Sequence, residues 1–229
     1  APGYHNEEWY VVAKHVPVEG QGFWSRSYTD PYSHQPMVTI TVALRDEAGE
    51  FLGVSTIDLK LEGLQSFCAR LSNKVGGSLF IMDRNNKFIT APVAAKPIAK
   101  AEKTSEEPLT AVEFSRRYPS FRNISQSLTQ ISEKFIYDGQ SKTDYVHDLE
   151  SVIDSSSYQI DRREAEIIAV MVHARESKNE EQFGLLKRLE TKEDYAIGEE
   201  AVVSIFSVPG SYWRIVLVVS KAEVVSVAW

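Results

Sequence analysis

The chain has 229 residues, of which 43% are hydrophobic and 25% are charged, and its 25 basic and 32 acidic side chains give a formal net charge of −7. This composition is typical of a globular protein and excludes collagen-like, mucin-like and wholly disordered classes. The acidic balance argues against DNA or RNA binding, which requires a basic surface. The strongly apolar runs are short, such as residues 215–219, so no membrane-spanning helix is predicted within the chain.

The chain contains a single cysteine, Cys68. Neither an intramolecular disulfide nor a multi-cysteine zinc site is therefore possible. Cys68 lies within an apolar pattern that includes Leu64 and Leu71, and we interpret it as a small core residue. One cysteine is compatible with the cytosol and with a bacterial periplasm. The chain begins without methionine and ends on Trp229, which is typical of an excised or processed fragment.

Strand signals dominate the first hundred residues. Residues 9–13 form a short aromatic and β-branched run, which we interpret as a strand. Apolar side chains alternate with threonine over residues 37–44, and a second apolar run at 51–59 follows the turn at 46–50. This pattern predicts an antiparallel hairpin over residues 37–59.

The hairpin is followed by apolar residues at three- and four-residue spacing, which predict an amphipathic helix over residues 60–75 that ends at Gly76. Residues 79–82 and 88–90 are predicted as two further strands on either side of a tight turn. We therefore expect residues 9–92 to form one antiparallel sheet flanked by this helix.

The remainder of the chain differs in character. Residues 93–109 are rich in lysine, glutamate and proline and are interpreted as a connector, and residues 111–190 are predicted to be largely helical. Strand patterns return in a hairpin around Pro209-Gly210, and we expect residues 195–220 to belong to a second sheet. The order of elements predicts an α+β chain with a boundary near residue 95. The expected helical segments cover residues 121–135, 145–153, 167–172 and 183–189.

Catalytic and cofactor signatures are absent from the sequence. There is no phosphate-binding glycine loop and no Gly-x-Ser-x-Gly element. The histidines show no paired metal-ligand spacing. We therefore predict no catalytic residue, no metal site and no cofactor. The histidines are His5, His15, His34, His147 and His173.

Aromatic and acidic side chains are concentrated near the N-terminus. Tryptophan and tyrosine combine a flat apolar body with a polar edge, which suits a small polar ligand. Carboxylates beside aromatic faces suit a cation, through ion pairing and cation–π contact. The same composition also fits an aromatic-rich core flank with surface acids, and composition alone leaves both interpretations open. The residues in question are Trp9, Tyr10, Phe23, Trp24, Tyr28 and Tyr32, with Glu7, Glu8, Asp30 and Asp58.

The order of these residues resembles the double Cache domain, the PAS-like sensor module of bacterial transmembrane receptors. The matching pattern spans residues 9–92 and reads W-Y, W-S, Y-x-D, D-x-x-G-x-x-x-G-V-x-x-x-D-L, F-I-M-D and a closing proline. Residues 208–216 resemble the closing hairpin of the second, membrane-proximal module. The resemblance implies two PAS-like Cache modules with antiparallel sheets and a helical region between them. Residues 1–95 would form the membrane-distal, ligand-binding module, and residues 96–229 the helical region and the membrane-proximal, Cache-like module.

The resemblance also implies a function. Double Cache domains are extracytoplasmic sensors of histidine kinases, chemoreceptors and cyclic-dinucleotide enzymes, and they bind small ligands. The implied location is the periplasmic or extracellular face of the bacterial inner membrane. The implied partners are a small-molecule ligand and, in the full receptor, a second copy, with membrane segments outside this fragment. The ligand-contact positions carried over from the family are Trp9, Tyr10, Trp24, Tyr28, Asp30 and Asp58.

Two features of the sequence depart from the family pattern. Amino-acid-binding members carry an arginine two residues before the first tryptophan, where this chain has Glu7. An acid there repels a carboxylate, so we predict an amine ligand in preference to an amino acid or a carboxylate. The long N-terminal helix of the family does not precede the first module, and the helical stretch 111–190 is longer than expected for a second module.

Two alternatives to a sensor remain open. An enzyme would use Asp30 and Asp58 as a carboxylate pair for acid–base chemistry, although no nucleophile, metal cluster or cofactor loop accompanies them. A structural or dimerisation module would have a vestigial pocket and bind no ligand. Stabilisation by a ligand separates a sensor from a structural module, because binding to the folded state raises the melting temperature. Turnover of that ligand would indicate an enzyme.

Overall fold

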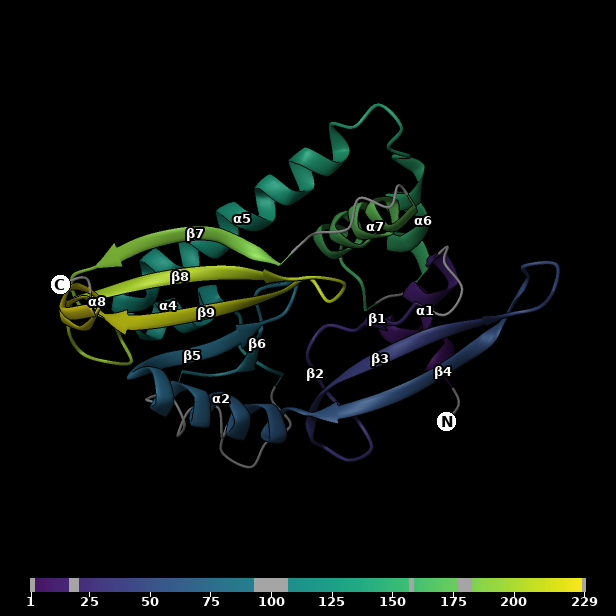
Figure 1. Ribbon diagram of the computed structural model, residues 1–229. Coiled ribbons are helices and arrows are strands. Elements are labelled where there is room, and N and C mark those ends of the chain that lie inside the picture. Colours follow the sequence, from purple (N-terminus) through teal and green to yellow (C-terminus); the bar gives the residue numbers. More distant parts are fainter. Residues whose placement is uncertain (1–2, 17–20, 93–106, 157–158, 177–182, 228–229) are drawn as a thin grey trace. The chain divides into compact units, whose positions relative to one another are not determined.

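The computed structural model describes residues 3–16, 21–92, 107–156, 159–176 and 183–227 (Figure 1). The chain divides into two compact units and passes between them several times. These units do not follow the expected boundary near residue 95. The first unit comprises Ala1–Arg26, Val38–Leu59 and Ser132–Glu181, and the second comprises Ser27–Met37, Lys60–Ile131 and Gln182–Trp229.

The N-terminal segment is helical, so the predicted strand at residues 9–13 is wrong. A 3-10 helix, η1 (Tyr4–Asn6), leads into α1 (Glu8–His15). Glu8 lies in the first turn of α1 and Lys14 and His15 in the last, which suits the helix dipole. Residues 10–13 are all buried. A short apolar run that is buried on every side has no period to distinguish helix from strand.

The first sheet contains the predicted hairpin. Its strands are β1 (Phe23–Trp24), β2 (Tyr28–Thr29), β3 (Pro36–Arg45) and β4 (Phe51–Lys60). β1 and β2 pair with the same long strand, β3, which also pairs with β4. Asp46 closes the β3–β4 turn, since its carboxylate accepts hydrogen bonds from the amides of Ala48 and Glu50 at 2.9 and 2.8 Å. The hairpin prediction is therefore confirmed.

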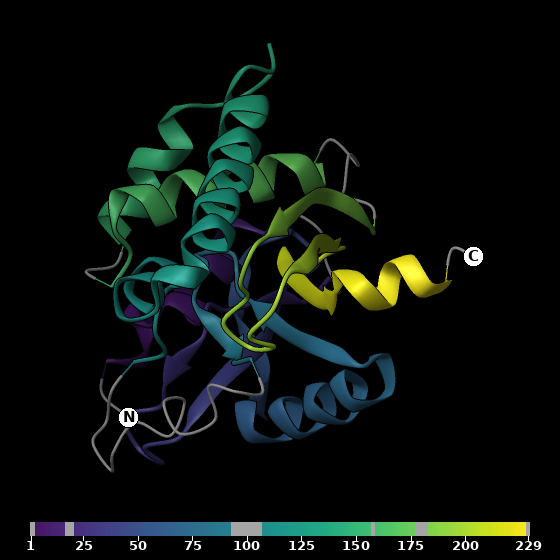
Figure 2. The same cartoon turned by 90° about the vertical axis from the view of Figure 1, so that its left-hand side faces the viewer.

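Helix α2 (Leu61–Val75) follows β4 directly, as predicted. Gly76 caps it with a left-handed backbone (φ +62°), and the Gly76 amide donates to the carbonyl of Ser72. The helix packs against β5 (Gly77–Met82) and β6 (Phe88–Thr90) (Figures 1 and 2). Cys68 is fully buried, as expected for a core residue.

The second sheet has the strand order β6-β5-β9-β8-β7. Besides β5 and β6 it contains β7 (Gly184–Thr191), β8 (Ala201–Val208) and β9 (Trp213–Ser220). The expectation that residues 9–92 form one sheet is therefore wrong, because β5 pairs with β9 from Gly77↔Val219 to Met82↔Arg214. Period-two alternation shows that a segment is a strand but does not show which strand it pairs with.

Strand β7 replaces a predicted helix. Leu185, Leu186 and Leu189 suggested helical spacing, but the segment pairs with β8. The register shifts between Leu185 and Lys187, and such a bulge disrupts strict alternation. Two adjacent leucines in a bulged strand therefore resembled part of a helical stripe.

The segment between the two blocks of strands is helical, as predicted. It contains α4 (Ala111–Arg117), η3 (Pro119–Phe121), α5 (Arg122–Gln140), α6 (Asp148–Ser156) and α7 (Arg162–Glu176). The connector expected at residues 93–109 lies mostly outside the described residues. After β9 the chain forms α8 (Lys221–Val227). None of the helices in the described ranges is long and apolar enough to cross a membrane.

Aromatic rings fill the interior of the second unit. Phe80 and Phe88 of the sheet meet Phe114 and Phe121 from the helical segment, with the centroids of Phe88 and Phe114 separated by 5.0 Å and those of Phe114 and Phe121 by 4.9 Å. All four are buried and belong to one hydrophobic cluster that also includes residues of β8 and β9. The helix α4 and the turn η3 are therefore held to the sheet mainly by ring packing.

Candidate ligand-binding site

Tyr10 and Trp9 occupy adjacent positions on α1 in the first unit. Tyr10 is 8% exposed, and its ring meets those of Trp9, Tyr4 and Phe51 edge-on, with centroids 6.1, 5.3 and 5.7 Å away. The Lys14 ammonium lies 5.0 Å from the centroid of the Tyr10 ring. Trp9 is only half-buried. Tyr10 therefore acts as a core ring that holds Trp9 at the edge of the aromatic cluster.

The side chains of Phe23 and Trp24 lie on opposite faces of the first sheet. Phe23 pairs with Thr41 and Trp24 with Ile40 across β1 and β3. Because neighbouring side chains on a strand point to opposite faces, the two rings lie on opposite sides of the sheet. Phe23 is buried, whereas Trp24 is half-buried, so Trp24 retains surface that a ligand can contact.

Asp58 is an exposed residue of β4 with one hydrogen bond from the neighbouring strand. Its Oδ1 accepts a bond from the hydroxyl of Thr39 at 2.8 Å. The amide of Thr39 in turn donates to the hydroxyl of Ser25 at 2.9 Å, and the amide of Ser25 donates to the Thr39 carbonyl at 2.8 Å. The Asp58 carboxylate is thereby oriented by the sheet while remaining accessible.

Tyr28 and Asp30 belong to the second unit, so the structure does not bring Asp30 and Asp58 together within one unit. Tyr28 pairs with Met37 in β2 and β3. The Asp30 carboxylate accepts a hydrogen bond from the amide of Ser33 at 2.6 Å. Slight burial acts to raise the pKa of Asp30, but hydrogen bonds from Ser33 and Tyr32 and the charge of His34 together hold the pKa below its ordinary value. The Asp30 carboxylate therefore stabilises the loop formed by residues 30–33.

Glu7, the residue that motivated an amine ligand, occupies the N-cap position of α1. Its backbone is extended, with φ −68° and ψ 140°, and its side chain makes no capping hydrogen bond. Its carbonyl accepts from the amides of Tyr10 and Val11, both at 3.0 Å. The backbone of Glu7 thus begins the helix.

Sequence reasoning missed a buried arginine of α7 in the same unit as Asp58. Arg175 is 4% exposed, its Nη2 donates to the carbonyl of Gly22 at 3.1 Å, and its guanidinium lies 5.3 Å from the centroid of the Phe23 ring. The hydroxyl of Thr41, across from Phe23, is buried without a hydrogen-bond partner. Gly22 and Arg175 are separated by 153 positions, so no local pattern indicated this contact.

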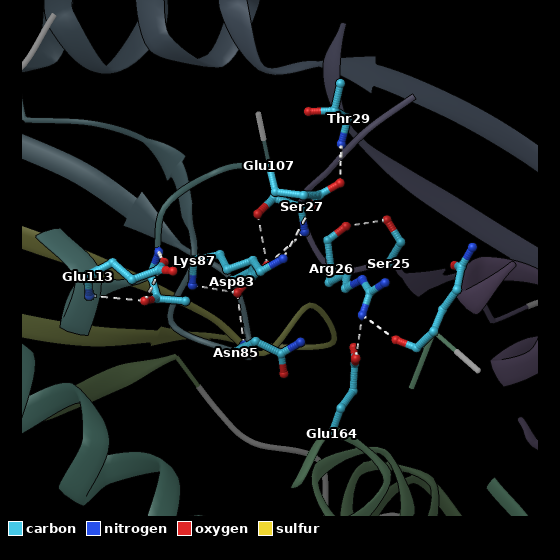
Figure 3. Close-up of polar contacts among 12 residues, drawn as sticks. Ser25, Arg26, Ser27, Thr29, Asp83, Asn85, Lys87, Glu107, Glu113 and Glu164 are labelled. Atoms are coloured by element: carbon cyan, nitrogen blue, oxygen red, sulfur yellow. Dashed lines mark hydrogen bonds and ion pairs between the residues drawn. The ribbon is translucent and has the colours of Figure 1, made fainter. Parts of the chain in front are cut away.

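A second missed feature is the polar contacts of residues 25–27 (Figure 3). In the first unit, Arg26 Nη1 binds Glu164 Oε2 and the carbonyl of Gln159, both at 2.7 Å. In the second unit, Asp83 Oδ2 accepts from the amide and the hydroxyl of Ser27 at 2.7 and 3.0 Å. Burial raises the pKa of the Asp83 carboxyl, while hydrogen bonds from Ser27 and Lys87 oppose the shift.

Within the described ranges, no group of three or more histidine, cysteine, aspartate or glutamate side chains is placed to hold a metal ion. The polar groups that the structure does place near the predicted ligand residues are hydrogen-bond donors, acceptors and charges.

The comparisons with known proteins agree with this description. Residues 2–66 match the family described as "Methyl-accepting chemotaxis protein-like, first PDC sensor domain". In fold the chain is similar to the extracellular domain of the putative histidine kinase mmHK1S-Z2, with a TM-score of 0.53 and 16% identity over 98% of this chain and 59% of that chain. The extracellular domain of the putative histidine kinase mmHK1S-Z3 gives a TM-score of 0.52 and 17% identity over 100% of this chain and 58% of that chain.

A third solved structure is the ligand-binding domain of the Pseudomonas fluorescens chemoreceptor CtaA in complex with L-leucine. It gives a TM-score of 0.46 and 14% identity over 97% of this chain and 63% of that chain. The chain thus spans less than two thirds of each of these three structures. No curated protein matches the chain. Residues 2–66 are thus similar to a first PDC sensor domain, and the chain shares an α+β fold with two antiparallel sheets with the extracellular domains of the two putative histidine kinases.

Proposed function

We propose that the chain is the extracytoplasmic, ligand-binding sensor region of a bacterial signal-transduction receptor. The observation that carries the proposal is the match of residues 2–66 to a first PDC sensor domain, because this stretch contains all the predicted ligand residues. The receptor would be a histidine kinase, a chemoreceptor or a cyclic-dinucleotide enzyme. The domain would face the periplasm or the exterior, pair with a second copy in the full receptor, and leave catalysis to an output domain elsewhere.

The proposed ligand is a small amine held in the first unit. Asp58 offers an exposed carboxylate that the Thr39 hydroxyl already orients, and an ammonium group binds such an oxygen through charge-assisted hydrogen bonds. Half-buried Trp9 offers a ring face for cation–π contact. Trp24 pairs with Ile40 on the face of the sheet opposite to Thr39, so its role as a ligand contact stays a prediction separate from the Asp58 carboxylate. Tyr10 supports Trp9 from the core. Tyr28 and Asp30 belong to the second unit, and their assignment as ligand-binding residues stays a prediction.

A carboxylate or amino-acid ligand is the second candidate, favoured by one specific observation. Arg175 brings a guanidinium to the interior of the first unit, over the ring of Phe23. Phe23 pairs across the sheet with Thr41, whose hydroxyl is buried without a hydrogen-bond partner. Arginine forms planar, bidentate hydrogen bonds with carboxylates. A ligand held by Arg175 and Asp58 together would carry both a carboxylate and an ammonium group.

A melting-temperature screen tests the proposal. We expect primary diamines such as 1,4-diaminobutane to raise the melting temperature with increasing concentration, because a ligand at a hundredfold excess over its Kd stabilises the folded state by about 2.7 kcal/mol. L-amino acids and dicarboxylates are the comparison sets. Stabilisation by dicarboxylates alone would overturn the proposal of an amine ligand. Stabilisation by none of a broad set of small molecules would favour a structural module.

A further inference from the structure

The backbone passes from the first unit to the second between Arg26 and Ser27, and the side chain of each is fixed within its own unit (Figure 3). A single peptide bond therefore joins two anchored residues. Ser27 is fully buried, and so is Asp83, its partner. No flexible linker separates Arg26 from Ser27, so a displacement of one residue is passed on to the other.

On the first-unit side, a series of polar contacts connects the proposed ligand site with Arg26. Asp58 accepts from Thr39, whose backbone exchanges hydrogen bonds with Ser25. Ser25 is the residue before Arg26. Arg26 is then fixed to α7 by the ion pair with Glu164, whose side chain is only 4% exposed. Low exposure strengthens such a charged hydrogen bond relative to one in water.

On the second-unit side, Asp83 joins Ser27 to the turn between β5 and β6. One carboxylate oxygen accepts from Ser27, and the other accepts from the amides of Asn85 and Lys87 at 2.8 and 2.9 Å. Asp83 directly follows β5, which pairs along its whole length with β9, and α8 follows β9. A shift of Ser27 therefore acts on the turn and the strand next to it.

We propose that Ser25, Arg26 and Ser27 form a coupling segment through which occupancy of the Asp58 site changes the stability of the Asp83–Lys87 turn. This regulatory role rests on the proposed sensor function. A cation bound to Asp58 draws negative charge from the carboxylate, so the hydrogen bond from the Thr39 hydroxyl weakens and the Thr39–Ser25 pairing changes. The alteration reaches Asp83 through the backbone, because Ser27 donates two hydrogen bonds to the same oxygen.

Contiguity alone does not demonstrate coupling, so the test perturbs one unit and measures the other, with no ligand present. Glu164→Gln removes the charge partner of Arg26 within the first unit. The matched control is Glu166→Gln on the same helix, which removes an equal charge from the surface pairs with Arg162 and Arg163. Amide hydrogen exchange is followed by NMR, which reports local opening residue by residue.

We expect Glu164→Gln to speed exchange of the Asn85 and Lys87 amides severalfold, while Glu166→Gln leaves them unchanged. Coupling is reciprocal, so Asp83→Asn should speed exchange of the Thr39 amide in the first unit. If Glu164→Gln does not fold, Ser25→Ala replaces it, because it removes the hydroxyl that accepts from the Thr39 amide within the first unit, and the same result is expected for Asn85 and Lys87. Equal effects of Glu164→Gln and Glu166→Gln, or effects confined to the mutated unit, would overturn the proposal.

A separate measurement with 1,4-diaminobutane distinguishes this proposal from the proposed function. Exchange at Asn85 and Lys87 that responds to Glu164→Gln but not to the diamine would support the coupling segment and argue against an amine ligand. Diamine binding seen by calorimetry, with these amides unaffected by Glu164→Gln, would support the amine sensor and overturn the coupling segment.

Discussion

The carboxylate of Asp83 accepts hydrogen bonds from both the amide and the hydroxyl of Ser27, at 2.7 and 3.0 Å, in an interior where neither residue is exposed. The two residues are 56 positions apart, and Asp83 also holds the amides of its own turn. Buried polar groups of this kind are costly when their partners are removed. The arrangement therefore makes Asp83 important for the stability of the second unit.

Asp83→Ala should lower the free energy of unfolding by about 2–4 kcal/mol, because it leaves two buried donors of Ser27 and two half-buried amides of the turn without an acceptor. Ser27→Ala removes one hydroxyl donor and should cost about 1 kcal/mol. Urea denaturation measures both changes. Equal stability of Asp83→Ala and the wild type would show that water replaces the carboxylate in the turn.

Gly77 and Gly63 offer a matched pair of glycine substitutions. A Cβ at Gly77 would lie 2.2 Å from the carbonyl oxygen of Val218, so Gly77→Ala should separate β5 from β9 and destabilise the protein clearly. A Cβ at Gly63, inside α2, meets nothing within 4 Å. Gly63→Ala should therefore raise stability by about 0.5–1 kcal/mol through helix propensity. Both stabilities are measured by thermal unfolding. Equal changes in melting temperature for the two variants would contradict the β5–β9 pairing.

The start of α4 gives stability a defined pH dependence. Thr110 and Glu113 form a capping box, and the hydrogen bond from the Thr110 amide holds the pKa of Glu113 below its ordinary value of 4.5. Because the folded-state pKa is depressed, this stabilisation is present above pH 4.5 and is lost as the pH falls through the folded-state pKa.

Glu113→Gln should therefore weaken the dependence of stability on pH below 4.5, as measured by urea denaturation across that range. Thr110→Ala should cost about 0.5–2 kcal/mol at neutral pH, since it removes the cap. An unchanged pH profile in Glu113→Gln would argue that the carboxylate does not cap the helix in solution.

Asp58→Ala tests the proposed amine site. Loss of a charged hydrogen bond costs about 1.5–3 kcal/mol, so the affinity for 1,4-diaminobutane should fall roughly ten- to a hundredfold in calorimetry. The control is Asp46→Ala, which also removes one negative charge, but from a carboxylate that accepts hydrogen bonds within the β3–β4 turn. It should leave the affinity unchanged. Tight binding of a dicarboxylate, or equal effects of both substitutions, would contradict the amine site.

Elements specified by neighbouring residues were predictable from the sequence. The β3–β4 hairpin follows from alternation on either side of a turn, and α2 follows from helical spacing that ends at a left-handed Gly76. These signals lie within a few positions of the structure they describe. For the same reason the short apolar runs at α1 and β7 were misassigned, because burial and strand pairing decided their structure.

The candidate site was only partly predictable. Trp9, Tyr10, Trp24 and Asp58 do fall within one unit, but that unit also includes residues 132–181, which bring in Glu164 and Arg175. The Arg26–Glu164 ion pair joins positions 138 apart. Sequence patterns carry no information about charges that meet across such separations, so nothing indicated that Arg26 had a buried partner.

The sequence by itself therefore determined the local elements, the α+β class and the resemblance that led to a sensor domain, because backbone preference and hydrophobic period act over short distances. Only the tertiary structure decided that β5 and β6 complete the second sheet with β7–β9. Tertiary packing also fixed the partners of Arg26, Asp83 and Arg175. Strand pairing and buried charge contacts depend on which distant segments exclude water together, and that is settled by packing of the whole chain.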